Sequence, residues 1–123
     1  MPRTNVVLLQ SDPKIAQTLA TLLASSFHRV DVAGSVDELR HAAAKHRPSA
    51  IVLDLESAPI TEVEALTKEF EGVRVICNHR VPDEEMWTRT LSLGAEDCCP
   101  SSDTSAILSA ATGSDELSRH MAA

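Results

Sequence analysis

The sequence predicts an α/β fold, in which one five-stranded parallel sheet is doubly wound, with helices on both faces. Two observations indicate this fold. Short apolar runs typical of strands buried on both faces, such as Val6–Leu9 and Ala50–Leu53, recur along the chain. Amphipathic segments of helical spacing separate the strand-like runs, and strict alternation of this kind implies right-handed crossovers between parallel strands.

The first half of the chain supplies three strands and two helices. After Val6–Leu9, the pair Asp12-Pro13 is a natural cap and first turn for a helix. The apolar stripe of that helix is formed by Ile15, Leu19, Leu22, Leu23 and the nearby Phe27. Arg29–Val32 alternates polar and apolar residues, as an exposed edge strand does. Ser35 and Glu38 form a capping box for a helix that runs to His46 and is ended by Pro48, before the strand Ala50–Leu53.

The second half repeats this alternation. A second capping box, of Thr61 and Glu64, opens a helix that runs through Phe70 and is closed by Gly72. A strand is expected at Val73–Cys77, and a helix over Asp83–Leu93 that Gly94 stops. A short strand containing Cys98 and Cys99 follows, and then a last helix, capped by Ser101 or Ser102, that runs through Ala111. Gly113 breaks the last helix, so we expect one domain over residues 1–112 and a tail or linker start over residues 113–123. The alternation leaves open whether the strand order is 2-1-3-4-5 or Rossmann-like.

Composition restricts the classes of function. The formal net charge of −7 disfavours nucleic-acid binding by this domain, and the aromatic content of 2% leaves no platforms for stacking bases. No apolar run is long enough to span a membrane and no secretion signal is visible, so we expect a cytoplasmic protein that does not bind membranes. The three cysteines, Cys77, Cys98 and Cys99, indicate neither a disulfide framework nor a zinc site and are expected to be buried thiols.

Polar side chains gather where the central strands end. In doubly wound sheets, ligands bind in the crevice at the carboxyl ends of such strands. Asp54 directly ends the run Ala50–Leu53, where a charge costs solvation energy unless it has a partner or a task. Taken alone, it fits a solvated strand end or a helix cap as well as a functional carboxylate. The polar residues expected near it are Gln10, Ser11, Asp12, Glu56, Asn78, His79 and Ser101.

Two segments carry a resemblance to a known family. Pro48–Leu55 resembles the segment of bacterial response-regulator receiver domains whose aspartate accepts a phosphoryl group, and Gly94–Asp97 resembles the segment before their fifth strand. Their order and spacing extend the resemblance over the chain to about Ala111. The resemblance implies a flavodoxin-like receiver fold with strand order 2-1-3-4-5. It also implies that Asp54 is the phospho-acceptor candidate in a phosphorelay, or two-component, system.

The chain departs from the family at the positions that assist phosphoryl transfer. Receivers hold Mg²⁺ with an acidic pair after the first strand, and a lysine after the fifth strand neutralises the phosphoryl group. The matching positions here hold Gln10 and Ser11 for the acidic pair and Ser101 for the lysine; Asn78 and Cys98 stand at the two switch positions. Asp12 is the nearby carboxylate, so Asp12 and Asp54 would form at most a weak Mg²⁺ site. The expected cofactor is therefore none or weakly bound Mg²⁺.

These departures predict a pseudo-receiver, a non-enzymatic signalling module with a degenerate phosphorylation site around Asp54. It would act by contact with a sensor kinase, an output domain or another signalling protein, and a homodimer is a further possibility. By resemblance, the contact face is built from the fourth helix, fifth strand and fifth helix. Its candidate residues are Trp87, Arg89 and Thr90, although Trp87 fits simple packing on the sheet equally well.

Two alternatives stay open. The first is a conventional receiver that is phosphorylated at Asp54, with Asp12 and Glu56 completing a magnesium site. The second is a small α/β ligand-binding or enzymatic domain that uses the crevice over Asp54, where Asn78, His79 and Ser101 would converge with it.

Overall fold

The computed structural model describes residues 3–113 as a five-stranded parallel sheet with the order β2-β1-β3-β4-β5. The strands are β1 (Arg3–Leu9), β2 (Phe27–Ala33), β3 (Ala50–Asp54), β4 (Arg74–His79) and β5 (Asp97–Pro100). The helices are α1 (Pro13–Ala24), α2 (Val36–His46), α3 (Thr61–Glu69), α4 (Glu84–Ser92) and α5 (Thr104–Thr112). The predicted α/β class is confirmed, and so is the strand order that the resemblance implied.

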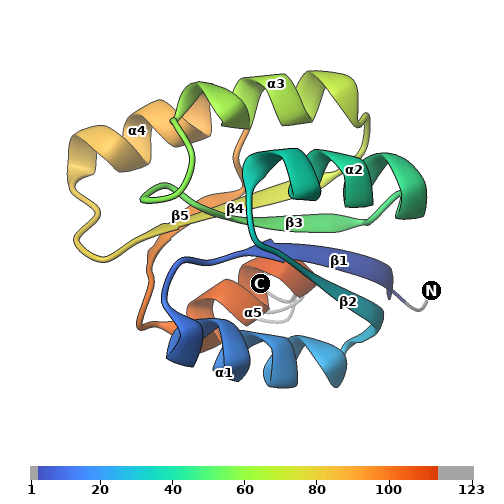
Figure 1. Cartoon of the computed structure of the whole chain (residues 1–123). Helices are drawn as coiled ribbons and strands as arrows, with labels where there is room; N and C mark the ends of the chain where they lie inside the picture. The colour runs from blue at the N-terminus through green and yellow to red at the C-terminus, as the bar shows by residue number, and fades with distance from the viewer. Residues whose placement is uncertain (1–2, 114–123) are drawn as a thin grey trace, which may run out of the picture.

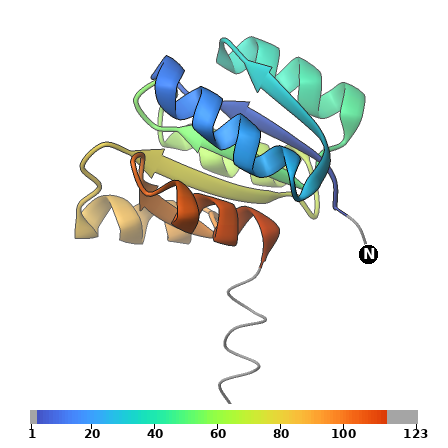
Figure 2. The ribbon, with the colours of Figure 1, turned by 90° about the horizontal axis from the view of Figure 1, so that it is seen from below.

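Helices cover both faces of the sheet. Helices α1 and α5 lie on one face, and α2, α3 and α4 lie on the other (Figures 1 and 2). Alternate residues of β1 enter opposite cores: Val6 and Leu8 pack toward α1 and α5, whereas Val7 and Leu9 pack toward α2 and α3. Each such buried side chain contributes about 1.5–3 kcal/mol. Strands buried on both faces explain why the sequence runs are almost continuously apolar.

Two helix starts follow the expected capping. Asp12 caps α1, since its Oδ1 accepts the backbone N–H of Lys14 at 2.9 Å, and Pro13 is the first helical residue. Ser35 caps α2 by accepting the N–H of Glu38 at 3.1 Å. The Glu38 carboxylate reaches back one residue further than a standard capping box, to the N–H of Gly34.

Two other expected caps are wrong. Helix α3 begins at Thr61 itself and has no side-chain cap, because the backbone carbonyls of Pro59 and Ile60 accept the first N–H groups. Helix α5 is capped by Asp103, not by Ser101 or Ser102, because the Asp103 carboxylate accepts the N–H of Ala106 at 3.1 Å. Ser101 is buried instead and faces β4.

The end of α5 matches the expectation. Gly113 closes the helix with φ 77°, a left-handed conformation that glycine adopts without steric cost. The rest of the expected tail, residues 114–123, lies outside the described residues. Within residues 3–113 no helix is both long enough and apolar enough to cross a membrane.

Candidate functional site

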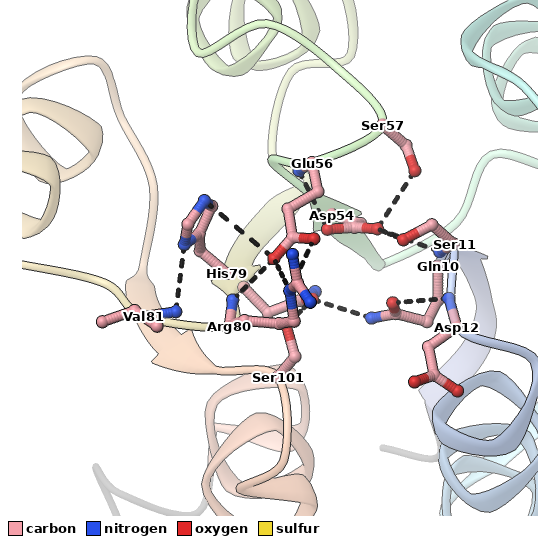
Figure 3. Close-up of polar contacts among 11 residues, drawn as sticks. Gln10, Ser11, Asp12, Asp54, Glu56, Ser57, His79, Arg80, Val81 and Ser101 are labelled. Carbon is pink, nitrogen blue, oxygen red and sulfur yellow. Dashed lines mark hydrogen bonds and ion pairs between the residues drawn. The ribbon is translucent and has the colours of Figure 1, made fainter.

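Asp54 lies at the carboxyl end of β3, between β1 and β4, and is 1% exposed. Its carboxylate accepts four hydrogen bonds (Figure 3). Oδ2 accepts the backbone N–H of Ser11 at 2.9 Å, the Ser11 hydroxyl at 2.6 Å and the Ser57 hydroxyl at 3.0 Å. Oδ1 accepts the backbone N–H of Glu56 at 2.9 Å. Both oxygens therefore have partners within the protein.

These contacts determine the acidity of the group. Burial raises the pKa of Asp54, but the hydroxyl of Ser11, the N–H groups of Glu56 and Ser11, and the hydroxyl of Ser57 together outweigh it. The net result is a pKa below the ordinary value of an aspartate. Asp54 is thus an ionised carboxylate stabilised by neutral donors and not by a cation.

A second polar chain crosses the sheet beside Asp54. The side-chain Nε2 of Gln10 donates to Oδ1 of Asn78 at 2.8 Å, and the hydroxyl of Ser101 donates to the same oxygen at 2.9 Å. These three residues lie at the ends of β1, β4 and β5, so parallel strands bring them together as expected. Asn78 is fully buried, and its Nδ2 has no hydrogen-bond partner. The amide oxygen of Asn78 is thus held by Gln10 and Ser101, the two residues that the resemblance matches to an acid and a lysine.

Glu56 and Arg80 form an ion pair at the outer edge of this region. Oε1 of Glu56 accepts the backbone N–H of Arg80 at 2.9 Å and its Nε at 3.1 Å. Nε2 of His79 lies 4.0 Å from the same oxygen, and its Nδ1 accepts the N–H of Val81. The Glu56 carboxylate is therefore engaged with the loop after β4.

The residues present do not fit the Mg²⁺ site that the resemblance implies. The Asp12 carboxylate caps α1 and points away from Asp54 (Figure 3). The Gln10 amide oxygen accepts the N–H of Asp12 at 3.1 Å, and Glu56 is paired with Arg80. Mg²⁺ requires several free oxygen ligands in octahedral geometry. Across residues 3–113, His, Cys, Asp and Glu side chains form no group of three or more able to hold a metal ion.

The expected contact face is only partly at the surface. Trp87 is 47% exposed, and its Nε1 donates to Oδ1 of Asp97 at 3.3 Å, so the indole lies along the seam between α4 and β5. Arg89 is exposed. Thr90 and Cys98 are buried, so neither side chain is available to a partner. Thr90 was a contact candidate by resemblance, and its burial on α4 contradicts that expectation.

Two further observations concern the crevice. Ser57, which donates to Asp54, was missed at the sequence level, because a hydrogen bond between two side chains of one loop has no spacing signal of its own. A cavity of about 320 Å³ lies beside the site, between the loop after β3 and α4. Leu55, Ile60 and Met86 are among its lining residues, and Asp54 is not.

Comparisons with known proteins give structural matches only. Neither the protein-family models nor the curated proteins contain a match to the chain. The receiver domain of a Bacteroides fragilis response regulator matches with TM-score 0.79 at 15% identity, covering 90% of this chain and 95% of that one. A Burkholderia pseudomallei response regulator, solved with a phosphorylated aspartate, a calcium ion and citrate, matches with TM-score 0.78 at 19% identity, covering 97% and 73%.

A third match is a complex from Borrelia burgdorferi. The CheX–CheY–BeF₃–Mg²⁺ complex matches with TM-score 0.77 at 19% identity, covering 89% of this chain and 87% of that one. All three matches extend over most of this chain at low identity and share its architecture. The chain therefore has the fold of response-regulator receiver domains.

Proposed function

We propose that this chain is a receiver-like signalling module that acts through protein–protein contact, in a conformation that does not depend on phosphorylation of Asp54. One observation carries the proposal: the Asp54 carboxylate accepts four hydrogen bonds from Ser11, Glu56 and Ser57, three at Oδ2 and one at Oδ1. A nucleophilic oxygen must give up such bonds to attack a phosphodonor. Because these bonds also lower its pKa, the carboxylate is a weaker nucleophile.

Charge around Asp54 supports the same proposal. Phosphoryl transfer relies on cations that neutralise the developing charge. The hydroxyls of Ser11, Ser57 and Ser101 are neutral donors. Arg80, which follows β4, is already paired with Glu56, and its side chain is 78% exposed. A phosphoryl group on Asp54 would place a doubly negative phosphate where a singly negative carboxylate stood, without a side-chain cation bound to it.

The two switch positions support a fixed conformation. The amide oxygen of Asn78 accepts hydrogen bonds from Gln10 and Ser101 within the interior, and these two bonds oppose a movement of the side chain toward a phosphoryl group. Cys98 is a small buried thiol with no ring that could rotate between the core and the surface. Neither residue therefore transmits a change at Asp54 to the region of α4 and β5.

A protein partner is part of the proposal. The Borrelia match is one chain of a complex between two proteins, and this chain has the fold of that matched chain. A sensor kinase, an output domain or another signalling protein would contact the side of α4 and β5 where Trp87 and Arg89 are exposed. A half-exposed tryptophan supplies a large apolar contact area, as residues that dominate interfaces do.

The test is treatment with a small phosphodonor. We expect no mass increase after incubation with acetyl phosphate and Mg²⁺, and no amide shifts on addition of beryllofluoride with Mg²⁺. The matched control restores the family residues by the triple substitution Gln10→Asp, Ser11→Asp and Ser101→Lys, which should gain both responses. Stoichiometric modification of the unaltered chain that is lost in Asp54→Asn, with shifts reaching Trp87, would instead establish a working phosphorylation switch.

A further inference from the structure

We propose that the outer edge of β2 is a two-fold interface with a second copy of this chain. Strand β2 is the edge of the sheet, flanked by α1 on one face and α2 on the other (Figure 1). It pairs with β1 on one side, and no other strand of residues 3–113 pairs with its outer side. Edge strands are templates for pairing with another chain unless something blocks them.

The charges on β2 are self-complementary. Arg29 and Asp31 are two residues apart and so point to the same face of the strand. They pair within the chain, with Nε of Arg29 3.0 Å from Oδ2 of Asp31. In an antiparallel pairing centred on Val30, residue 29 of each copy lies opposite residue 31 of the other. Each Arg29 would then meet Asp31 of the second copy, so four charges alternate in sign across the two-fold axis.

An acidic hollow lies where the second Arg29 would arrive. A cavity of about 400 Å³ is bordered by the end of β2 and the start of α2, and its carboxylates are Asp31, Asp37 and Glu38. The Arg29 side chain is paired through Nε with Asp31 and is 53% exposed, so its guanidinium is accessible to a neighbour. These three carboxylates outnumber the guanidinium of Arg29 that pairs with Asp31, and His41 is the other titratable side chain of the lining. A guanidinium from a second copy would correct that excess.

The other face of β2 gains apolar burial. Val32 is 55% exposed and is one of three large hydrophobic side chains exposed in the described part of the chain. The same pairing places Val32 opposite His28 of the second copy and brings the two Val30 side chains together. Edge charges usually prevent such pairing when they are alike in sign. On β2 the charges of Arg29 and Asp31 are opposite in sign, so the antiparallel pairing centred on Val30 is attractive. A register shifted by two residues would place like charges opposite each other.

The test separates contacts between copies from the ion pair within one copy. Sedimentation velocity should show a concentration-dependent dimer of the unaltered chain at concentrations up to about 1 mM. Arg29→Glu alone places acids opposite acids, and Asp31→Lys alone places cations opposite cations. Each variant should raise the dimer dissociation constant at least about tenfold. An equal mixture of the two variants should recover the dimer, because the glutamate introduced in one copy then faces the lysine introduced in the other.

Two controls define the outcome. Glu96→Arg breaks a comparable surface ion pair, with Arg74 at 3.2 Å, away from β2 and should leave the dimer unchanged. Circular dichroism should show every variant folded. A chain that stays monomeric over the whole concentration range would overturn the proposal. So would a dimer that both single variants retain, or one that is lost in Trp87→Ala, since α4 would then be the interface.

Discussion

Replacing Asp54 by asparagine changes one atom and the charge, and the sign of its effect on stability depends on what surrounds the carboxylate. In a pocket of several acids, removing one charge relieves repulsion and stabilises the folded state. Around Asp54 the neighbours are hydrogen-bond donors: the hydroxyls of Ser11 and Ser57 and two backbone N–H groups. We therefore expect Asp54→Asn to lower the free energy of unfolding.

The size of the effect follows from the contacts. If the asparagine oxygen takes the place of Oδ2, the donors of Ser11 and Ser57 keep an acceptor, but a neutral one. The N–H of Glu56 then faces the amide nitrogen and loses its bond. One lost bond and three weakened bonds, offset in part by the burial of a neutral group, amount to about 2 kcal/mol. That is a large fraction of the roughly 5–15 kcal/mol typical of a domain's stability.

The assay is urea unfolding at pH 7. Trp87 is the single tryptophan, so its fluorescence reports the transition, and far-ultraviolet circular dichroism confirms it. A loss of about 2 kcal/mol moves the midpoint by roughly 1 M urea. Asp37→Asn, an exposed carboxylate in the first turn of α2, is the matched control and should change the stability by about a few tenths of a kcal/mol at most.

The stability difference between Asp54→Asn and the unaltered chain depends on pH. The pKa of Asp54 is lower in the folded chain than in the unfolded chain, so its stabilisation is present above the unfolded value. It is lost as the pH falls through the folded value. The difference between Asp54→Asn and the unaltered chain should therefore shrink in acid. A variant as stable as the original at neutral pH, or more stable, would refute this reasoning.

Three further predictions concern single groups. Ser11→Ala removes the 2.6 Å hydrogen bond to Oδ2 and should cost about 1 kcal/mol while raising the pKa of Asp54, measured by a carboxyl ¹³C titration. Millimolar Mg²⁺ should leave the amide shifts near Asp54 unchanged; saturable shifts that vanish in Asp54→Asn would reveal a site. Burial raises the pKa of Cys77 and of Cys99, the latter to about 12, so both thiols should resist a disulfide reagent at about pH 8 until urea unfolds the chain.

The fold was predictable because its signals are redundant. Each buried strand is a continuous apolar run, and each connection has the length of a helix, so no single misjudged residue changes the topology. A local error arose where the spacing of one residue fitted two neighbouring elements. Phe27 continues the helical stripe of α1 in spacing, yet it begins β2, because α1 ends at Ala24 and the turn places the ring in the same core from another direction.

The sequence predicted which residues lie in the candidate site, but not where each side chain points. Strand ends that meet at one edge had to bring Gln10, Asn78 and Ser101 close together, and the structure joins them by hydrogen bonds. Spacing along the chain does not say where a side chain points. Asp12 is two residues beyond Gln10, yet its carboxylate serves the N-terminus of α1 and not Asp54. Helix capping and metal binding compete for the same oxygens, and geometry decides between them.

Stability and reactivity are opposed at Asp54. An acidic pocket leaves its acceptor aspartate poorly satisfied until a cation arrives, and the cation then serves both folding and chemistry. At position 11, where the resemblance places such an acid, the serine hydroxyl adds a donor to the backbone N–H that any residue there would offer, so the carboxylate is stabilised without a metal. The same bonds lower the pKa of Asp54 and must be weakened or broken at the oxygen that attacks a phosphodonor. This opposition is the physical basis of the proposed function, in which the contact surface keeps one conformation and a partner binds the fold itself and not its phosphorylated state.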